Sequence, residues 1–158
     1  MSKGLRIEEI TNEQRRGAKC PERRLIFRKI PALKSNTKLR LLIVDDEPSV
    51  RTLLAQALTL SGYRVQSCAG GLSALSTIRQ EIPDVLVSDL NMPGMSGFEL
   101  LAVVRQRFPG IKIIAMSGAY SGNGIPTGVV ADAFYGKGTN FHALTQILDA
   151  MAVPPARC

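Results

Sequence analysis

The sequence predicts a doubly wound α/β fold, in which helices cover both faces of a parallel β-sheet. From residue 39 onward, short apolar runs typical of buried strands alternate with stretches whose apolar residues recur at helical spacing. Strands that alternate with helices favour parallel pairing, because each helix returns the chain to the edge where the previous strand began. A second observation is that polar residues follow four of the strand-like runs. The length of 158 residues is enough for one such domain.

The expected strands are short and mostly aliphatic: Leu39–Val44, Tyr63–Ser67, Asp84–Ser88, Ile111–Met116 and Ala131–Tyr135. The expected helices have apolar residues at helical spacing: Val50–Leu60, Leu72–Arg79, Phe98–Phe108 and Phe141–Met151. Gly62 ends the first helix, and Pro109 with Gly110 ends the third. Five β/α units of this size fit a flavodoxin-like (βα)5 sheet with strand order 2-1-3-4-5.

The segment that should form the fourth helix differs from the others. Residues 119–130 contain three glycines and a proline, which make a poor helix. We therefore expect this helix to be short, displaced or mobile.

Charge divides the chain into an extension and a domain. Residues 1–38 carry eleven Lys/Arg and four Glu, a net charge of +7, whereas the rest carries nine of each sign and is neutral. We expect residues 1–38 to be a loosely ordered basic extension, residues 39–153 the domain, and residues 154–158 a short tail. A basic extension can bind nucleic acid, with strongly salt-dependent affinity, or can simply be a solvated tail.

Composition places the chain among ordinary globular proteins, with 45% hydrophobic and 21% charged residues. No apolar stretch approaches the ~20 residues that span a membrane, and the first residues lack the apolar core of a secretory signal. Cys20, Cys68 and Cys158 lie far apart, which predicts free thiols and no zinc site. We expect a cytoplasmic protein.

The polar residues after the strands form one predicted constellation. Asp45 and Asp46 follow the first strand, Asp89 the third, Ser117 the fourth and Lys137 the fifth. With strand order 2-1-3-4-5 these four strands are neighbours, and such sheets bind ligands at the carboxyl ends of their strands. We therefore expect three carboxylates, a hydroxyl and an ammonium to meet in one cleft.

The chemistry of this set indicates phosphoryl transfer. Three close carboxylates repel one another unless they take up protons or a cation lies among them. Mg²⁺ prefers oxygen ligands and is typically held by one or two carboxylates and phosphate oxygens. A carboxylate beside Mg²⁺ can attack phosphorus and become an aspartyl phosphate, provided that positive charge and donors surround the transferred group. Lys137 supplies the charge and Ser117 the donor.

Each residue also has an ordinary structural interpretation. Asp46 would cap the first helix, Asp89 would belong to a β-turn, Ser117 would bond loop backbone, and Lys137 would be a solvated lysine. Their joint placement at four neighbouring strand ends favours the functional interpretation.

Two motifs give these residues a family resemblance. Residues 42–48, Leu-Ile-Val-Asp-Asp-Glu-Pro, resemble the opening acidic motif of response-regulator receiver domains. Residues 89–97, Asp-Leu-Asn-Met-Pro-Gly-Met-Ser-Gly, are similar to the phosphorylation loop of that family. The resemblance covers roughly residues 39–151 and implies a CheY-like single-domain response regulator of two-component phosphorelays.

The resemblance implies a metal-dependent phosphoacceptor. Asp89 would accept the phosphoryl group. Asp46, Asp89 and the backbone carbonyl of Asn91 would ligate Mg²⁺, for which Mn²⁺ would substitute, and Asp45 would assist through a metal-bound water. The chain would be no enzyme toward other molecules and would catalyse only its own phosphorylation and dephosphorylation.

The resemblance also implies a switch. Ser117 would hydrogen-bond the phosphoryl oxygen and move toward it, and Lys137 would pair with Asp89 before phosphorylation and with the phosphoryl group afterwards. Phe134 matches the aromatic that turns inward when the hydroxyl moves, and Gly118 matches the small residue that leaves the phosphate accessible. One departure is Gly138, which stands where the family usually has a proline after the lysine; a trans bond is therefore favoured here.

The implied partners are a sensor histidine kinase or phosphotransfer protein and a separate downstream target, because no output domain follows the last helix. Residues 1–38 leave nucleic-acid binding open, and a homodimer is also left open. Asn91 stands where a haloacid-dehalogenase-type phosphatase needs a second aspartate, which disfavours that class. The remaining alternative is a receiver-like interaction module that docks partners without phosphorylation.

Overall fold

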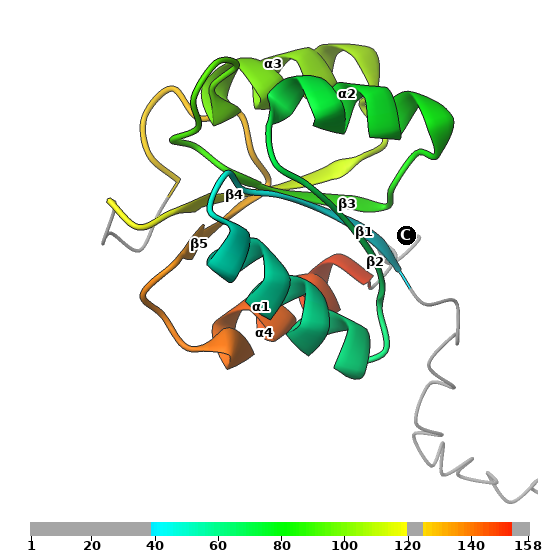
Figure 1. The fold of residues 1–158 in the computed structure, drawn as a ribbon, viewed down its shortest axis with the longest axis vertical. Helices are drawn as coiled ribbons and strands as arrows, with labels where there is room; N and C mark the ends of the chain where they lie inside the picture. The colour runs from blue at the N-terminus through cyan, green and yellow to red at the C-terminus, as the bar shows by residue number, and fades with distance from the viewer. Residues whose placement is uncertain (1–38, 120–124, 153–158) are drawn as a thin grey trace, which may run out of the picture. The chain divides into compact units, whose positions relative to one another are not determined.

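The computed structural model describes residues 39–119 and 125–152 and contains a five-stranded parallel sheet (Figure 1). The strands are β1 (Arg40–Val44), β2 (Arg64–Cys68), β3 (Val85–Asp89), β4 (Lys112–Ser117) and β5 (Ala133–Gly136). Their order is β2-β1-β3-β4-β5, and every neighbouring pair is parallel. The predicted fold class and strand order are thereby confirmed.

The helices are α1 (Pro48–Leu60), α2 (Gly71–Gln80), α3 (Gly97–Arg107) and α4 (Phe141–Ala152). Figure 1 shows α2 and α3 on one face of the sheet and α1 and α4 on the other. The described residues between β4 and β5 (118–119 and 125–132) contain no helix, as the glycine-rich composition of this segment predicts. The predicted extension, residues 1–38, and the tail, residues 154–158, lie outside the described residues.

Two apolar layers hold the sheet between the helices. Side chains that alternate along β1 point to opposite faces, so that Leu42 packs with the α2–α3 layer and Ile43 with the α1–α4 layer. All five residues of β3 are buried, which is expected of a central strand covered on both faces. Within the described residues no helix is long and apolar enough to cross a membrane.

Local sequence explains where two helices begin. Pro48 opens α1, where its missing N–H leaves no hydrogen bond unmade. Ser96 caps α3 through a reciprocal box: its Oγ accepts from the Glu99 backbone N–H at 3.3 Å, and the Glu99 carboxylate accepts from the Ser96 N–H at 2.9 Å.

Gly97 is required where α3 meets the end of β3. A Cβ at this position would lie 2.0 Å from the carbonyl oxygen of Asp89 and 2.6 Å from Cα of Leu90. The Gly97 N–H donates to the Leu90 carbonyl at 3.0 Å, which fixes this close approach. The absence of a side chain therefore sets the distance between α3 and the backbone of Asp89.

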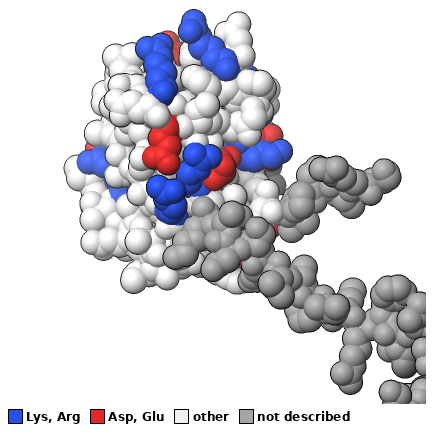
Figure 2. Space-filling model, turned by 90° about the vertical axis from the view of Figure 1, so that its right-hand side faces the viewer, with Lys and Arg blue, Asp and Glu red and all other residues white. Residues whose placement is uncertain are grey.

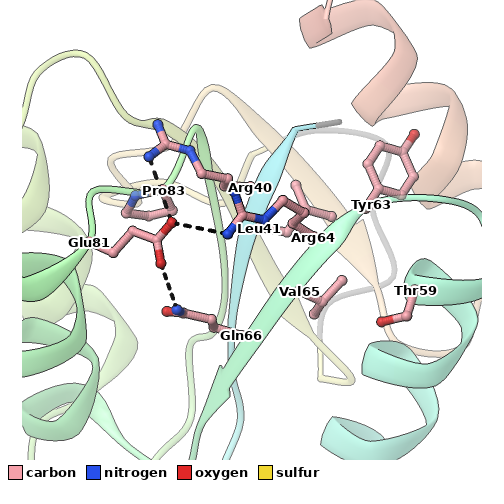
Figure 3. A pocket seen from close by; sticks show the side chains of 9 residues that line it. All are labelled: Arg40, Leu41, Thr59, Tyr63, Arg64, Val65, Gln66, Glu81 and Pro83. Atoms are coloured by element: carbon pink, nitrogen blue, oxygen red, sulfur yellow. Dashed lines mark hydrogen bonds and ion pairs between the residues drawn. The ribbon is translucent and has the colours of Figure 1, made fainter. Parts of the chain in front are cut away.

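Ion pairs tie together the amino ends of the strands, opposite the predicted site. Arg40 donates to Asp84 through Nη2 at 3.0 Å and through its backbone N–H at 2.8 Å. Glu81 lies between Arg40 and Arg64, at 3.9 and 3.7 Å, and accepts from Gln66 at 3.0 Å (Figure 3). Figure 2 shows this end of the sheet, where basic and acidic side chains lie side by side.

A hollow of about 360 Å³ opens beside these pairs, lined by Tyr63, Val65 and Pro83 among others (Figure 3). The charged side chains around it are engaged with one another, so this end of the sheet is a structural brace. The polar residues that the sequence singles out lie at the other end.

We predict that Gly97→Ala destabilises the fold by about 3 kcal/mol, because the new methyl group collides with backbone atoms that cannot yield. Urea denaturation measures this difference in the free energy of unfolding. Gly110→Ala is the matched control, since a Cβ there meets nothing within 4 Å. Equal stability of the two variants would contradict the close-approach argument.

A second prediction concerns Asp84, whose pKa lies below its usual value because Arg40 hydrogen-bonds the carboxylate. A lowered pKa stabilises the fold above the ordinary carboxyl pKa of about 3.9, and this contribution is lost as the pH falls through the lowered value. Asp84→Asn should therefore cost about 1 kcal/mol at neutral pH, since the pair is partly exposed, and less in acid. Denaturation at both pH values measures this difference. The control is Asp149→Asn, which changes an exposed carboxylate of the last helix that accepts from the Tyr63 hydroxyl at 3.4 Å and not from an arginine. A cost for Asp84→Asn that does not change with pH would refute the prediction.

Candidate functional site

The carboxyl ends of β1, β3, β4 and β5 bring the predicted residues together at one edge of the sheet. In the strand register Asp89 lies opposite Met116, and Ser117 lies opposite Gly136. The backbone of Lys137 donates to the Ser117 carbonyl at 2.9 Å, which continues the β4–β5 pairing by one residue. Pairing of the strands, and not contact of the side chains alone, therefore places Asp89, Ser117 and Lys137 side by side.

Lys137 is the cation of the site. Its Nζ lies 2.8 Å from Oδ2 of Asp45 and 2.8 Å from Oδ2 of Asp89. Burial alone lowers the pKa of Lys137, but hydrogen bonds and the charges of Asp45 and Asp89 outweigh it and leave the pKa above its usual value. The lysine therefore stays charged at neutral pH and neutralises one of the carboxylates around it.

Asp45 is fully buried and held at both ends of its carboxylate. Its Oδ1 accepts the backbone N–H of Glu47 at 2.9 Å, which turns the chain from β1 into α1. Within the described part of the chain, its Oδ2 has the ion pair with Lys137 and no further hydrogen bond. A buried carboxylate oxygen with one partner retains capacity for a further donor or cation.

Three carboxylate oxygens, one each from Asp45, Asp46 and Asp89, lie within 4.8 Å of one another. Asp46 is exposed, whereas Asp45 and Asp89 are buried. Lys137 balances only one of these three charges, so a divalent cation is the species that the remaining charge and the oxygen ligands favour. The residues present fit Mg²⁺.

Ser117 is fully buried, with its hydroxyl oxygen held from two sides. The Asn91 side-chain amide donates to Oγ at 3.3 Å, and the backbone N–H of Ala119 donates at 3.1 Å. Both contacts use Oγ as an acceptor, which leaves the hydroxyl hydrogen available as a donor. Asn91 also donates its backbone N–H to Oδ1 of Asp89 at 3.3 Å.

The two remaining predicted residues lie close to this set. Phe134 is half-buried and packs against the α2–α3 layer. Gly118 is exposed, and a Cβ there would meet the Lys137 side chain at 3.9 Å, an ordinary contact. The described residues contain no cis peptide bond, so the bond between Lys137 and Gly138 is trans.

Two contacts of the site lie outside the predicted set. Arg51 donates Nη1 to the backbone carbonyl of Asp45 at 2.6 Å, and the side chain of Asn91 reaches Ser117. The sequence did carry a signal for Arg51, since it stands in the first turns of the helix that the acidic pair opens. Only the folded chain shows which backbone group it meets.

Comparison with known protein families shows which family has this fold and acidic site. The model of the response regulator receiver domain matches residues 41–136, more than half of the chain. The chain belongs to the response-regulator receiver family. Members of this family are the phosphorylatable signalling modules of two-component systems, and they generally bind Mg²⁺ at an acidic pocket.

Solved receiver domains share the fold over most of the chain. The response regulator TrrA of Thermotoga maritima, solved in complex with Mg²⁺-BeF, is 32% identical, with a TM-score of 0.66 over 72% of this chain and 98% of that one. The chemotaxis response regulator CheY4 of Vibrio cholerae is 29% identical, with a TM-score of 0.67 over 73% of this chain and 99% of that one.

Curated relatives match over a shorter stretch. The DNA-binding transcriptional regulator NtrC of Klebsiella pneumoniae is 41% identical over 75 residues, which is 48% of this chain and 16% of NtrC. The receiver domain here therefore corresponds to a small part of that regulator.

We predict that Lys137→Met destabilises the receiver domain by up to about 3 kcal/mol without metal, because two buried carboxylates lose their cation. Added Mg²⁺ should recover part of this loss and raise the melting temperature of Lys137→Met more than that of the wild type. Thermal unfolding in Mg²⁺ and in EDTA measures both effects.

The control is Lys112→Met, which removes an exposed lysine at the start of β4. The same response to Mg²⁺ in both variants would show that Lys137 does not share the acidic site with the metal.

Proposed function

We propose that this receiver domain accepts a phosphoryl group on Asp89 from the phosphohistidine of a sensor histidine kinase or phosphotransfer protein, and then changes its binding to a downstream target. The observation that supports this most is the position of Lys137, 2.8 Å from both Asp45 and Asp89 beside a buried hydroxyl. Phosphoryl transfer to an aspartate requires a cation, a hydrogen-bond donor and a carboxylate, and all three lie together at the carboxyl ends of these strands.

In the proposed step a carboxylate oxygen of Asp89 attacks phosphorus in line with the leaving imidazole. The new bond joins oxygen to phosphorus, the phosphorus–nitrogen bond breaks, and the nitrogen keeps the electron pair. Lys137 then exchanges its contact with Asp89 for one with the phosphoryl oxygens, while its ion pair with Asp45 keeps the ammonium in place. The Ser117 hydroxyl donates its free hydrogen to another of these oxygens.

Mg²⁺ would be held by Asp46, Asp89 and the backbone carbonyl of Asn91, with Asp45 acting through a bound water, and when bound it offsets the negative charge of the phosphoryl group. The Oδ2 of Asp45, which has Lys137 as its partner and room for a further one, and the 4.8 Å cluster support this assignment. Mn²⁺, with similar ligand preferences, should substitute.

The partner and the switch rest on further observations. TrrA has been solved in complex with the histidine kinase ThkA, which supports a kinase as the phosphoryl donor here.

Phe134 lies in β5, which pairs with the strand of Ser117, so it would move as the hydroxyl moves. Small Ala119 beside Ser117 leaves room for water, so we expect the domain to lose its phosphoryl group by its own action. We propose that it works in the cytoplasm.

A second function, constitutive docking without phosphorylation, is favoured by two departures from the family. Gly138 replaces the usual proline, and residues 125–132 form no helix. The phosphorylation experiment described next separates the two functions.

We predict that acetyl phosphate with Mg²⁺ adds one phosphoryl group to the full chain, detected by intact mass. EDTA and Asp89→Asn should each abolish the adduct, since one removes the cation and the other the nucleophile. Ser117→Ala should slow its formation by about a hundredfold, the cost of losing one donor to the developing charge.

Asp84→Asn is the matched carboxylate control, because Asp84 lies at the opposite end of the sheet, and it should phosphorylate like the wild type. A folded wild-type protein that gains no adduct in Mg²⁺ would favour the constitutive module instead.

A further inference from the structure

Arg51 makes a contact with the acidic site that the phosphorylation chemistry above does not use. It lies in α1, half-buried, and its Nη1 donates to the backbone carbonyl of Asp45 at 2.6 Å. The contact runs from the helix back across the loop that joins β1 to α1. Arg51 is therefore a second cation at the edge of the site, but one that bonds backbone and not a carboxylate.

The contact completes the restraints on Asp45. The backbone N–H of Asp45 donates to the Cys68 carbonyl at 3.2 Å, its Oδ1 accepts the Glu47 N–H, and its Oδ2 pairs with Lys137. With the Arg51 contact, every polar group of Asp45 has a partner. This residue is fixed by β2, by its own loop, by β5 and by α1 together.

Asp46, the next residue, is in the opposite situation. Within the described residues its carboxylate makes no hydrogen bond or ion pair with the protein, although it belongs to the 4.8 Å cluster. Its position is therefore set by the backbone on either side of it. On one side stands Asp45, and on the other Glu47, whose carbonyl accepts the Arg51 N–H at 3.0 Å as α1 begins.

We propose that Arg51 is a positioning residue for the metal site: by holding the Asp45 carbonyl it fixes the loop of residues 45–47 and presents the free carboxylate of Asp46 to the cation. Arg51 bonds both flanks of Asp46, the Asp45 carbonyl through its side chain and the Glu47 carbonyl through its backbone. This inference rests on the proposed function, since it takes Asp46 as a ligand of Mg²⁺.

A guanidinium near a metal site has two effects of opposite sign on metal affinity. Its positive charge repels Mg²⁺, so that removing the charge alone would strengthen metal binding. Its hydrogen bond orders a ligand loop, so that removing the bond weakens metal binding, typically by about 10–100-fold for a group that orients a ligand. The sign of the change therefore tells the positioning role from a purely electrostatic one.

The test compares the full-length wild type with Arg51→Gln, Arg51→Lys and the control Arg64→Gln, which removes an exposed arginine at the far end of the sheet. Mg²⁺ affinity is measured by calorimetry, the free energy of unfolding by urea, and protection of the Glu47 amide by hydrogen exchange in the presence of EDTA. We expect Arg51→Gln to bind Mg²⁺ about tenfold more weakly and to lose Glu47 protection, with no comparable change in Arg64→Gln.

Arg51→Lys keeps a charged donor but offers a single ammonium on a different stem, so it should recover part of both readouts. If Arg51→Gln does not fold, Arg51→Lys takes its place as the test variant. Weaker protection of the Glu47 amide in Arg51→Lys, with an unchanged free energy of unfolding, would then report a loosened loop and not a destabilised fold. Unchanged or tighter Mg²⁺ binding by Arg51→Gln would overturn the positioning role. A wild type that binds no Mg²⁺ would refute the proposed function itself, and the inference with it.

Discussion

The ion-paired cluster of Lys137 with Asp45 and Asp89 is the constraint on which the rest of this structure depends. Two carboxylates are buried 2.8 Å from one ammonium, at a place where an unpaired charge would be strongly destabilising. A third carboxylate, Asp46, lies beside them. The domain thus keeps an excess of negative charge at the carboxyl ends of its strands. This excess favours a bound divalent cation and phosphoryl transfer assisted by that cation.

The sheet topology is what makes this arrangement possible. Parallel strands end at one edge, and the order β2-β1-β3-β4-β5 puts the strands that carry the charged residues next to one another. The opposite edge is braced by ion pairs among Arg40, Asp84 and Glu81, which partner one another. The amino ends of the strands thus stabilise the sheet, whereas the carboxyl ends hold unbalanced negative charge.

Backbone contacts act together with the ion pairs of Lys137 to give the site its geometry. Gly97 lets α3 approach the Asp89 carbonyl, the Asp45 carbonyl is held by Arg51, and the Ser117 carbonyl accepts from Lys137. Each contact couples a residue of the site to a different helix or strand. A change at Asp89 can therefore alter the positions of several helices and strands, as a signalling module of this family requires.

The sequence by itself determined the fold class and the residues that gather at the strand ends, because short apolar runs, helical spacing and strand-end polar residues are local signals. The strand order followed from the fold class that these signals indicate. It also predicted a poor helix after β4, from three glycines and a proline. Only the tertiary structure decided that Lys137 bridges Asp45 and Asp89, that Asn91 holds Ser117, and that Arg51 meets the Asp45 carbonyl. These contacts join residues from different elements, and their distances depend on how strands pair and helices pack, which no local pattern encodes.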